Sequence, residues 1–170
     1  MNTKELTKSA IFLAIGTILH YIVPGLVGGM KPDFLLLMMF LAILLNTKLK
    51  SALTVSILGG IIAALTTTFP GGQIPSVLDK LISGLFVYFI ASLLTSNNKL
   101  SSIAVTILTA LGTLVSGIIF AGTAAIIVGL PQGLSFTALI ATVVIPTTLI
   151  TGFFSGILYS VLRRAKRTLK

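Results

Sequence analysis

Six apolar segments follow one another along this chain, separated by short polar stretches. They cover approximately residues 7–23, 34–45, 51–69, 77–95, 101–128 and 135–162. None shows the period-two alternation that is typical of the strands of a membrane barrel. A membrane-spanning helix needs roughly 17–25 residues, and most of the segments are that long. The pattern therefore predicts an all-α integral membrane protein, a bundle of six transmembrane helices.

The composition supports this class. Of the 170 residues, 55% are hydrophobic and only 9% are charged, whereas a soluble domain has about 25% charged residues. A water-soluble fold could not cover so much apolar surface, so we expect one membrane domain over residues 1–170, embedded in the lipid bilayer. The first apolar run is too long for a signal-peptide core, and we expect it to remain as a helix.

The positive charges predict the topology. With the N-terminus in the cytoplasm, ten of the twelve Lys and Arg residues fall at inner helix ends, and only Lys31 and Lys80 fall on outer loops. This asymmetry is typical of membrane proteins with basic inner loops. It predicts that both termini are cytoplasmic. The net charge of +9 then reflects topology, and we expect no nucleic-acid partner.

Three local patterns predict details of the helices. Segment 34–45 is short, so its helix either begins in the preceding loop or is shallow. Pro146 should kink the last segment. Small residues at Gly152 and Gly156, and at Ala10 and Ala14, permit close helix approach, and the alanine pair could instead face a partner helix.

No catalytic motif is present. The sequence has one His, no Cys, three acidic residues and no phosphate-binding G-x-x-x-x-G-K-[ST] sequence. We therefore expect neither an enzyme nor a bound metal or cofactor, and any uphill transport must draw its energy from a partner or an ion gradient.

The two outer loops, "GGMKPD" and "FPGGQIPSVLDK", resemble each other. Each has a glycine pair, a proline and an acid close to a base, as a loop that folds over a ligand would have. The structural alternatives are that Asp33 caps the next helix, that Lys31 reaches the lipid headgroups, and that Ser76 and Asp79 form an S-x-x-D capping box. Alternatively Asp79 faces a cavity and binds a substrate ammonium.

Two further positions lie at the same depth. His20 and Tyr21 precede Pro24 near the outer end of the first segment. Tyr21 could be an interfacial anchor, and His20 could be satisfied by a hydrogen bond between helices. Both could equally line an outward-facing pocket, together with the helix face that carries Asp79 and Phe86.

The chain as a whole resembles a known family. "SAIFLAIG" and the six short-looped helices are similar to the substrate-binding S component of energy-coupling factor (ECF) transporters. "LHYIVPGLVGGMKPDFLLLMMFLAILL" and "TFPGGQIPSVLDKLISG" resemble the TrpP-type tryptophan transporter family. The resemblance implies a multi-pass protein of the bacterial cell membrane that binds L-tryptophan in an outward-opening cavity. It also implies a T component, which would contact Ala10 and Ala14, and two ATPase subunits.

A zwitterionic substrate suggests roles for these residues. We expect Lys31 to bind the carboxylate and Asp79 or Asp33 to bind the ammonium. Gln73 or His20 could accept the indole N–H. The possible aromatic walls are Phe69, Phe86, Tyr88 and Phe120.

Other readings stay open. The chain could be an S component for another nutrient such as a vitamin, or a solitary secondary transporter. The latter should have an ionisable relay inside the membrane, and the predicted topology places no Asp, Glu or Lys there. An intramembrane enzyme would need a nucleophile paired with a base, which the sequence lacks.

Overall fold

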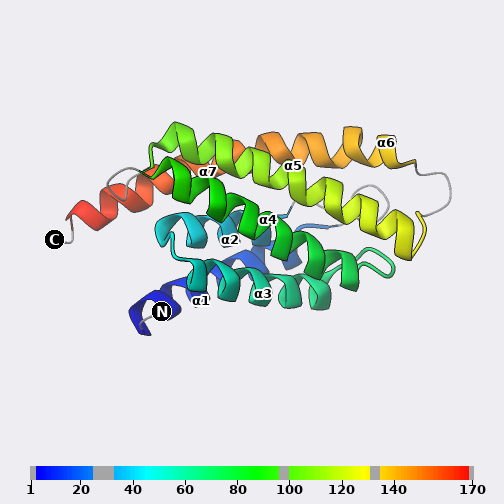
Figure 1. Ribbon diagram of the computed structural model, residues 1–170, viewed down its shortest axis with the longest axis horizontal. Coiled ribbons are helices and arrows are strands. Elements are labelled where there is room, and N and C mark those ends of the chain that lie inside the picture. The colour runs from blue at the N-terminus through cyan, green and yellow to red at the C-terminus, as the bar shows by residue number, and fades with distance from the viewer. Residues whose placement is uncertain (1–2, 25–32, 96–99, 131–134, 169–170) are drawn as a thin grey trace.

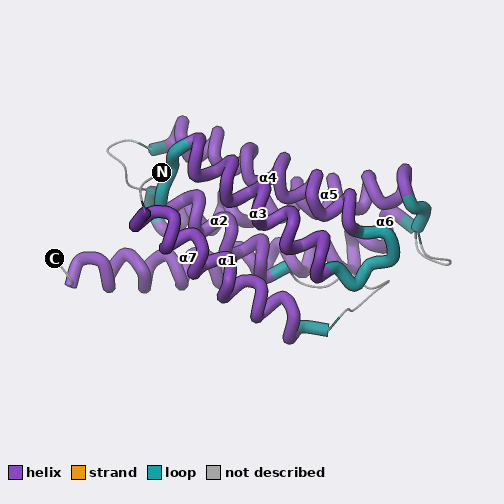
Figure 2. Tube along the Cα trace, turned by 90° about the horizontal axis from the view of Figure 1, so that it is seen from below, coloured by secondary structure: helices purple, strands orange, loops and turns teal. Residues whose placement is uncertain are grey.

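The computed structural model describes residues 3–24, 33–95, 100–130 and 135–168, with side chains as far as residue 165, and these residues form helices and connections without any strand. The elements are α1 (Thr3–Ile22), α2 (Phe34–Leu45), α3 (Leu49–Thr66), α4 (Gln73–Leu94), α5 (Ser102–Ile127), α6 (Phe136–Leu139), the π-helix η1 (Ile140–Val144) and α7 (Ile145–Thr168). The last three elements, α6, η1 and α7, are consecutive stretches of one long helix. Figures 1 and 2 show that the helices run roughly along the long axis of the molecule.

Within the described residues, four helical stretches are long and apolar enough to cross a membrane. They are Leu49–Thr66, Gln73–Leu94, Ser102–Ile127 and Phe136–Ala165. The predicted all-α class and the apolar segments are thus confirmed for this part of the chain. Large apolar side chains such as Leu65, Leu93 and Ile126 are exposed on the helix surfaces, as in a protein whose outside faces hydrocarbon.

Helix α2 lies in the centre of the bundle (Figure 1). It contacts α1, α3, α4, α5 and α7, and the ten residues from Leu35 to Leu44 are all buried. A helix that is apolar on every side is expected where neighbours surround it. Its 12 residues span about 18 Å at 1.5 Å per residue, too short for a bilayer core of about 30 Å. The helix begins at Phe34, and Asp33 caps it by accepting a hydrogen bond from Leu36 N at 2.9 Å.

Small and hydroxyl residues hold α5 against α7. A Cβ added at Gly152 would lie 3.1 Å from Ala110 Cβ, so the two helices approach closely here. Ser102 and Ser160 join the same pair of helices by a hydrogen bond of 2.7 Å between their hydroxyls. The predicted packing role of Gly152 is confirmed.

The irregular turn of the last helix lies where a kink was expected. The π-helix Ile140–Val144 ends two residues before Pro146. Proline has no N–H to donate to the preceding turn, so the regular α-helical ladder is interrupted around it. A wider π turn is one way in which a helix accommodates such an interruption. This turn places Val143 and Val144 toward the bundle interior, where both are buried.

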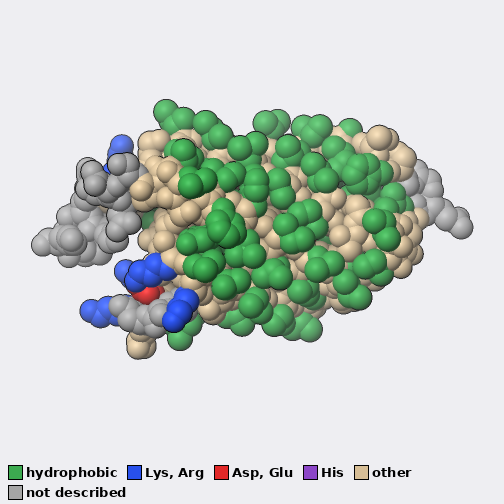
Figure 3. All heavy atoms as spheres, viewed as in Figure 1, with side chains coloured by type: hydrophobic (Ala, Val, Ile, Leu, Met, Phe, Trp, Pro, Cys, Tyr) green, Lys and Arg blue, Asp and Glu red, His purple; other side chains and the backbone are tan. Residues whose placement is uncertain are grey.

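Both termini lie at the same end of the bundle, and the Lys and Arg side chains visible on this face gather there (Figures 1 and 3). At that end Lys48 Nζ lies 2.6 Å from Glu5 Oε1. Hydrophobic side chains cover much of the remaining surface in this view. The molecule therefore has one basic end and an apolar flank.

Candidate functional site

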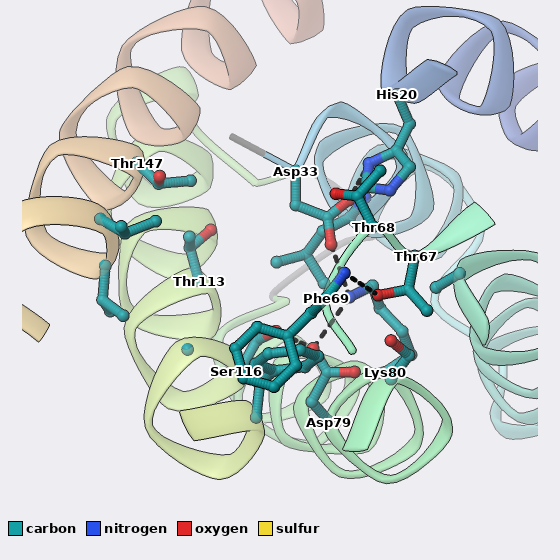
Figure 4. Close-up of a pocket in the computed structure, with 17 residues that line it drawn as sticks. His20, Asp33, Thr67, Thr68, Phe69, Asp79, Lys80, Thr113, Ser116 and Thr147 are labelled. Carbon is teal, nitrogen blue, oxygen red and sulfur yellow. Dashed lines mark hydrogen bonds and ion pairs between the residues drawn. The ribbon is translucent and has the colours of Figure 1, made fainter. Parts of the chain in front are cut away.

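A cavity of about 80 Å³ lies inside the bundle, well above the roughly 10–15 Å³ that one water molecule needs. Its lining comes from helices α1 to α5, η1 and α7 and from the connections before α2 and after α3: His20, Asp33, Leu36, Ala63, Thr67, Thr68, Phe69, Ser76, Asp79, Lys80, Thr113, Ser116, Gly117, Phe120, Val143, Val144 and Thr147. Figure 4 shows these side chains around the cavity. The helices supply them mainly from the half of the bundle away from the two termini.

Four ionisable side chains form a connected group at one side of the cavity, which we call the charged cluster: His20, Asp33, Asp79 and Lys80 (Figure 4). Lys80 Nζ lies 2.5 Å from Asp33 Oδ2 and 2.8 Å from Asp79 Oδ2. His20 Nδ1 lies 3.3 Å from Asp33 Oδ1. Because the Lys80 side chain is only 3% exposed, it depends on these two carboxylates to offset the loss of water around its charge.

Asp33 has three kinds of partner. It caps α2 through Leu36 N, and it faces both Lys80 and His20. Burial by itself would raise the pKa of this carboxyl, but the charges and hydrogen bonds of Lys80 and His20 outweigh that effect and hold the pKa well below its usual range. Asp33 is therefore an ionised carboxylate with both oxygens engaged.

The capping-box interpretation of Ser76 and Asp79 is wrong. Helix α4 begins at Gln73 after Gly72, which provides no side-chain cap. Gly71, with φ of 69°, makes the turn before it, in the left-handed region that glycine adopts without steric cost. Asp79 is consequently the seventh residue of the helix, about 9 Å along its axis from the first residue, and it is buried.

Lys80 is the larger departure from expectation, because the topology argument places it on an outer loop. The structure instead buries it inside the bundle beside α3. A glycine at position 60 allows this, since a Cβ there would lie 3.2 Å from Val77 Cα and 3.5 Å from Lys80 Cβ. The close approach of α3 and α4 thus encloses the lysine and its partners.

Asp79 differs from Asp33 in one respect. Its Oδ2 accepts hydrogen bonds from Lys80 Nζ at 2.8 Å and from Ser116 Oγ at 2.7 Å. Its Oδ1 is buried and has no hydrogen-bond partner among the described residues. A buried carboxylate oxygen without a donor is costly. The charged cluster therefore has one unused strong acceptor.

Apolar side chains form another part of the cavity lining. The rings of Phe69 and Phe120 meet edge to face, with centroids 5.4 Å apart and planes at 84°. Val143 and Val144 of the π-helix lie on the same cavity. A Cβ added at Gly117 would lie 2.5 Å from Val144 Cγ1, so a glycine is required where α5 meets this turn. This part of the lining is apolar and therefore favours an aromatic or aliphatic group over a charged one.

The structure brings together several residues that the sequence singled out. His20, Asp33, Asp79 and Phe69 all line the cavity, as does Phe120. The sequence analysis gave no role to Lys80 or to Ser116. An ionisable pair inside an apolar helix is itself a signal of function in a membrane protein, and that signal could have identified Lys80.

Other predicted site residues lie elsewhere. Tyr21 is 75% exposed on α1 and does not line the cavity. Gln73 is exposed at the start of α4, and Phe86 packs against the apolar core away from the cavity. Lys31 lies outside the described residues.

Comparison with known proteins identifies the family. The family described as "Tryptophan transporter TrpP" matches residues 2–167 of this chain. A "Probable tryptophan transport protein" of Bacillus subtilis (strain 168) is 44% identical over 167 residues, which cover 98% of this chain and 95% of the relative. Proteins of the same name from Clostridium perfringens (strain 13 / Type A) and Clostridium acetobutylicum are 43% and 41% identical, and each alignment covers 98% of this chain and at least 94% of the relative.

No solved structure shows significant similarity to this chain. The family match nevertheless extends over nearly the whole sequence and includes every helix of the bundle. The family match and the apolar spans together show that the chain is a multi-pass protein of the bacterial membrane. The chain belongs to the tryptophan transporter TrpP family.

Proposed function

We propose that this protein binds L-tryptophan in the cavity with high affinity and delivers it into the cell as the S component of an ECF-type importer. The observation that carries the proposal is a cavity whose lining combines the charged cluster with the aromatic rings of Phe69 and Phe120. An amino acid with an indole side chain likewise combines a charged head with a flat apolar body. The family to which the chain belongs supports this choice of substrate.

The apolar side offers a place for the indole. Phe69 and Phe120 provide aromatic faces and edges, while Val143 and Val144 provide an aliphatic surface. The indole N–H needs an acceptor when it is buried. Thr113 Oγ1 donates its own proton to Thr109 O at 2.8 Å, so its lone pairs remain available to accept the indole proton.

In this proposal the chain is a single domain with six membrane spans and both termini in the cytoplasm. The gathering of Lys and Arg at the end that holds both termini supports that orientation. The cavity then lies toward the external side, where a substrate arrives. The short α2, buried among its neighbours, is one of these six spans, although its 12 residues are too few to cross the bilayer core by themselves.

Helix α1 supports a role for partner proteins. Among the described residues it contacts only α2 and α3, and its outer face exposes Ala10 and Ala14 between larger apolar side chains such as Ile11, Ile15 and Ile18. A face of small residues permits a second helix to approach closely. In the proposed assembly this face meets the T component, and two ATPase subunits supply the energy.

A solitary secondary transporter is the second candidate, and the charged cluster specifically favours it. Such a transporter should have an ionisable relay inside the membrane, and Asp79 and Lys80 are both buried in the bundle. Ionisable residues buried in a membrane domain are common in proton relays. An S component for another nutrient, such as a vitamin, is a further alternative within the importer class.

The absence of tryptophan from the chain makes a direct test possible. With excitation beyond the tyrosine absorption band, the fluorescence of added tryptophan reports binding without a protein background. We expect saturable binding to the purified protein, with one site per chain. If vitamins shift the melting temperature and tryptophan does not, the substrate assignment is wrong.

Transport requires a separate test. Proteoliposomes containing the protein alone should bind tryptophan without accumulating it, and uptake should require the T component, the ATPases and ATP. If the isolated protein accumulates tryptophan in response to a proton gradient, the secondary-transporter candidate replaces the S-component role.

A further inference from the structure

We infer that the cavity recognises its ligand through a positively charged amine, which Asp79 binds, and that a ligand carboxylate is dispensable for binding. This inference rests on the proposed tryptophan function and adds which end of the substrate the protein selects. It starts from the charge balance of the described cavity lining. That lining contains two carboxylates, Asp33 and Asp79, and one ammonium, Lys80.

These charges are not shared evenly. Asp33 faces both Lys80 and His20, whereas the one cation beside Asp79 is Lys80, which Asp79 shares with Asp33. A buried carboxylate without a full partner is unfavourable. A ligand ammonium would give Asp79 a cation of its own, and a ligand carboxylate could not do so.

Asp79 is the acceptor that remains available for this cation. Asp33 already accepts a hydrogen bond from Leu36 N, and its carboxylate is paired with Lys80 and lies beside His20. The Oδ1 atom of Asp79 is buried in the cavity wall without a partner among the described residues. Because the terminal torsion of an aspartate is soft and nearly two-fold, a small rotation turns either oxygen toward a ligand.

Binding of the amine then gives each carboxylate of the cluster a cation of its own. Lys80 Nζ is already only 2.5 Å from Asp33 Oδ2, so it keeps one full partner when Asp79 turns to the ligand. The result is two matched pairs, Lys80 with Asp33 and the ligand ammonium with Asp79. Charge-assisted hydrogen bonds of this kind are the strong ones in proteins.

Among the described residues, a ligand carboxylate finds no such place. Lys80 is the one Lys or Arg in the described lining, and a carboxylate placed on it would compete with Asp33 and Asp79 for the same ammonium. The other side-chain donors of the described lining are the His20 imidazole, which faces Asp33, and hydroxyl groups such as that of Thr67. A hydroxyl can hydrogen-bond a carboxylate but cannot balance its charge.

The test compares three fluorescent indoles on the purified wild-type protein: tryptophan, tryptamine, which lacks the carboxylate, and indole-3-propionate, which lacks the amine. We expect tryptamine to bind within about tenfold of tryptophan, and indole-3-propionate to bind at least roughly 10- to 100-fold more weakly, the range for one charge-assisted hydrogen bond. Tighter binding of indole-3-propionate than of tryptamine overturns the inference.

The same panel separates this inference from the proposed function. If tryptophan and indole-3-propionate bind but tryptamine does not, the function stands and the amine inference is wrong. If tryptamine binds and tryptophan does not, the amine inference is supported and the proposed substrate is wrong. If no indole binds, both are wrong.

A matched pair of variants adds a second measurement. Asp79→Asn removes the charge and keeps the shape, and it should weaken both tryptophan and tryptamine by about 10- to 100-fold. Glu5→Gln makes the same change at the basic end, in the pair with Lys48, and should leave both affinities unchanged. Equal affinities of the two variants overturn the assignment of Asp79. If Asp79→Asn does not fold, the wild-type ligand panel still decides.

Discussion

Replacement of Lys80 by methionine tests whether the charged cluster holds the bundle together. Methionine fills a similar volume but removes the ammonium that lies 2.5 Å from Asp33 and 2.8 Å from Asp79. Both carboxylates are then left in a buried site without their cation. Removal of one partner from a buried ion pair costs about 3–5 kcal/mol. For a chain of this size, about 2–4 °C of melting temperature corresponds to each kcal/mol, so Lys80→Met should melt roughly 6–20 °C lower.

Lys48→Met is the matched control for this experiment. It makes the same substitution in a pair of similar length, 2.6 Å to Glu5, but the Lys48 side chain is 62% exposed. Exposed pairs contribute about 0–1 kcal/mol, so the melting temperature should fall by at most about 4 °C. Thermal unfolding of both variants in the same detergent provides the comparison. If Lys80→Met and Lys48→Met melt at the same temperature, the loss of the buried ammonium has no cost, and the structural role inferred for Lys80 is refuted.

Three further substitutions have expected outcomes. Asp33→Ala should destabilise the protein by more than the ~1 kcal/mol that a helix cap alone contributes. Ser101→Ala, which removes only the cap at the start of α5, is the control. Thermal unfolding of both variants checks this, and equal losses of stability would contradict it. Gly117→Ala places a Cβ 2.5 Å from Val144 Cγ1 and should cost about 1–3 kcal/mol by overpacking; unchanged stability and tryptophan affinity would contradict the close contact. Phe120→Ala should weaken tryptophan binding about tenfold through lost ring contacts, as fluorescence titration would show, and full affinity would place the indole elsewhere.

The sequence predicted the helices well because their signals are local and strong. The segment 34–45 coincides with α2, since a continuously apolar run preceded by an N-capping aspartate determines both the identity and the start of a helix. Pro146 likewise indicated an irregular turn, because its missing N–H affects the backbone wherever the helix lies.

The site was harder to predict because it depends on which helix faces meet. Asp79 was identified, but the serine three residues before it suggested a cap, and only the turn at Gly71 and Gly72 shows that the helix begins earlier. Lys80 looked like an outer-loop charge, since positive charges usually mark helix ends. Its burial requires partners from α2 and α4 together, which no local pattern in the sequence specifies.

The central position of α2 has a consequence for how the bundle stays assembled. In a bilayer, an apolar helix gains no hydrophobic free energy by leaving lipid for protein. The ten buried residues of α2 are therefore kept in the interior by packing alone, except at the first turn, where Asp33 fastens the helix to Lys80. The same carboxylate neighbours the cavity. A substitution of Asp33 thus changes the cavity lining and a polar contact of the innermost helix at the same time, so its effects on substrate preference and on assembly are coupled.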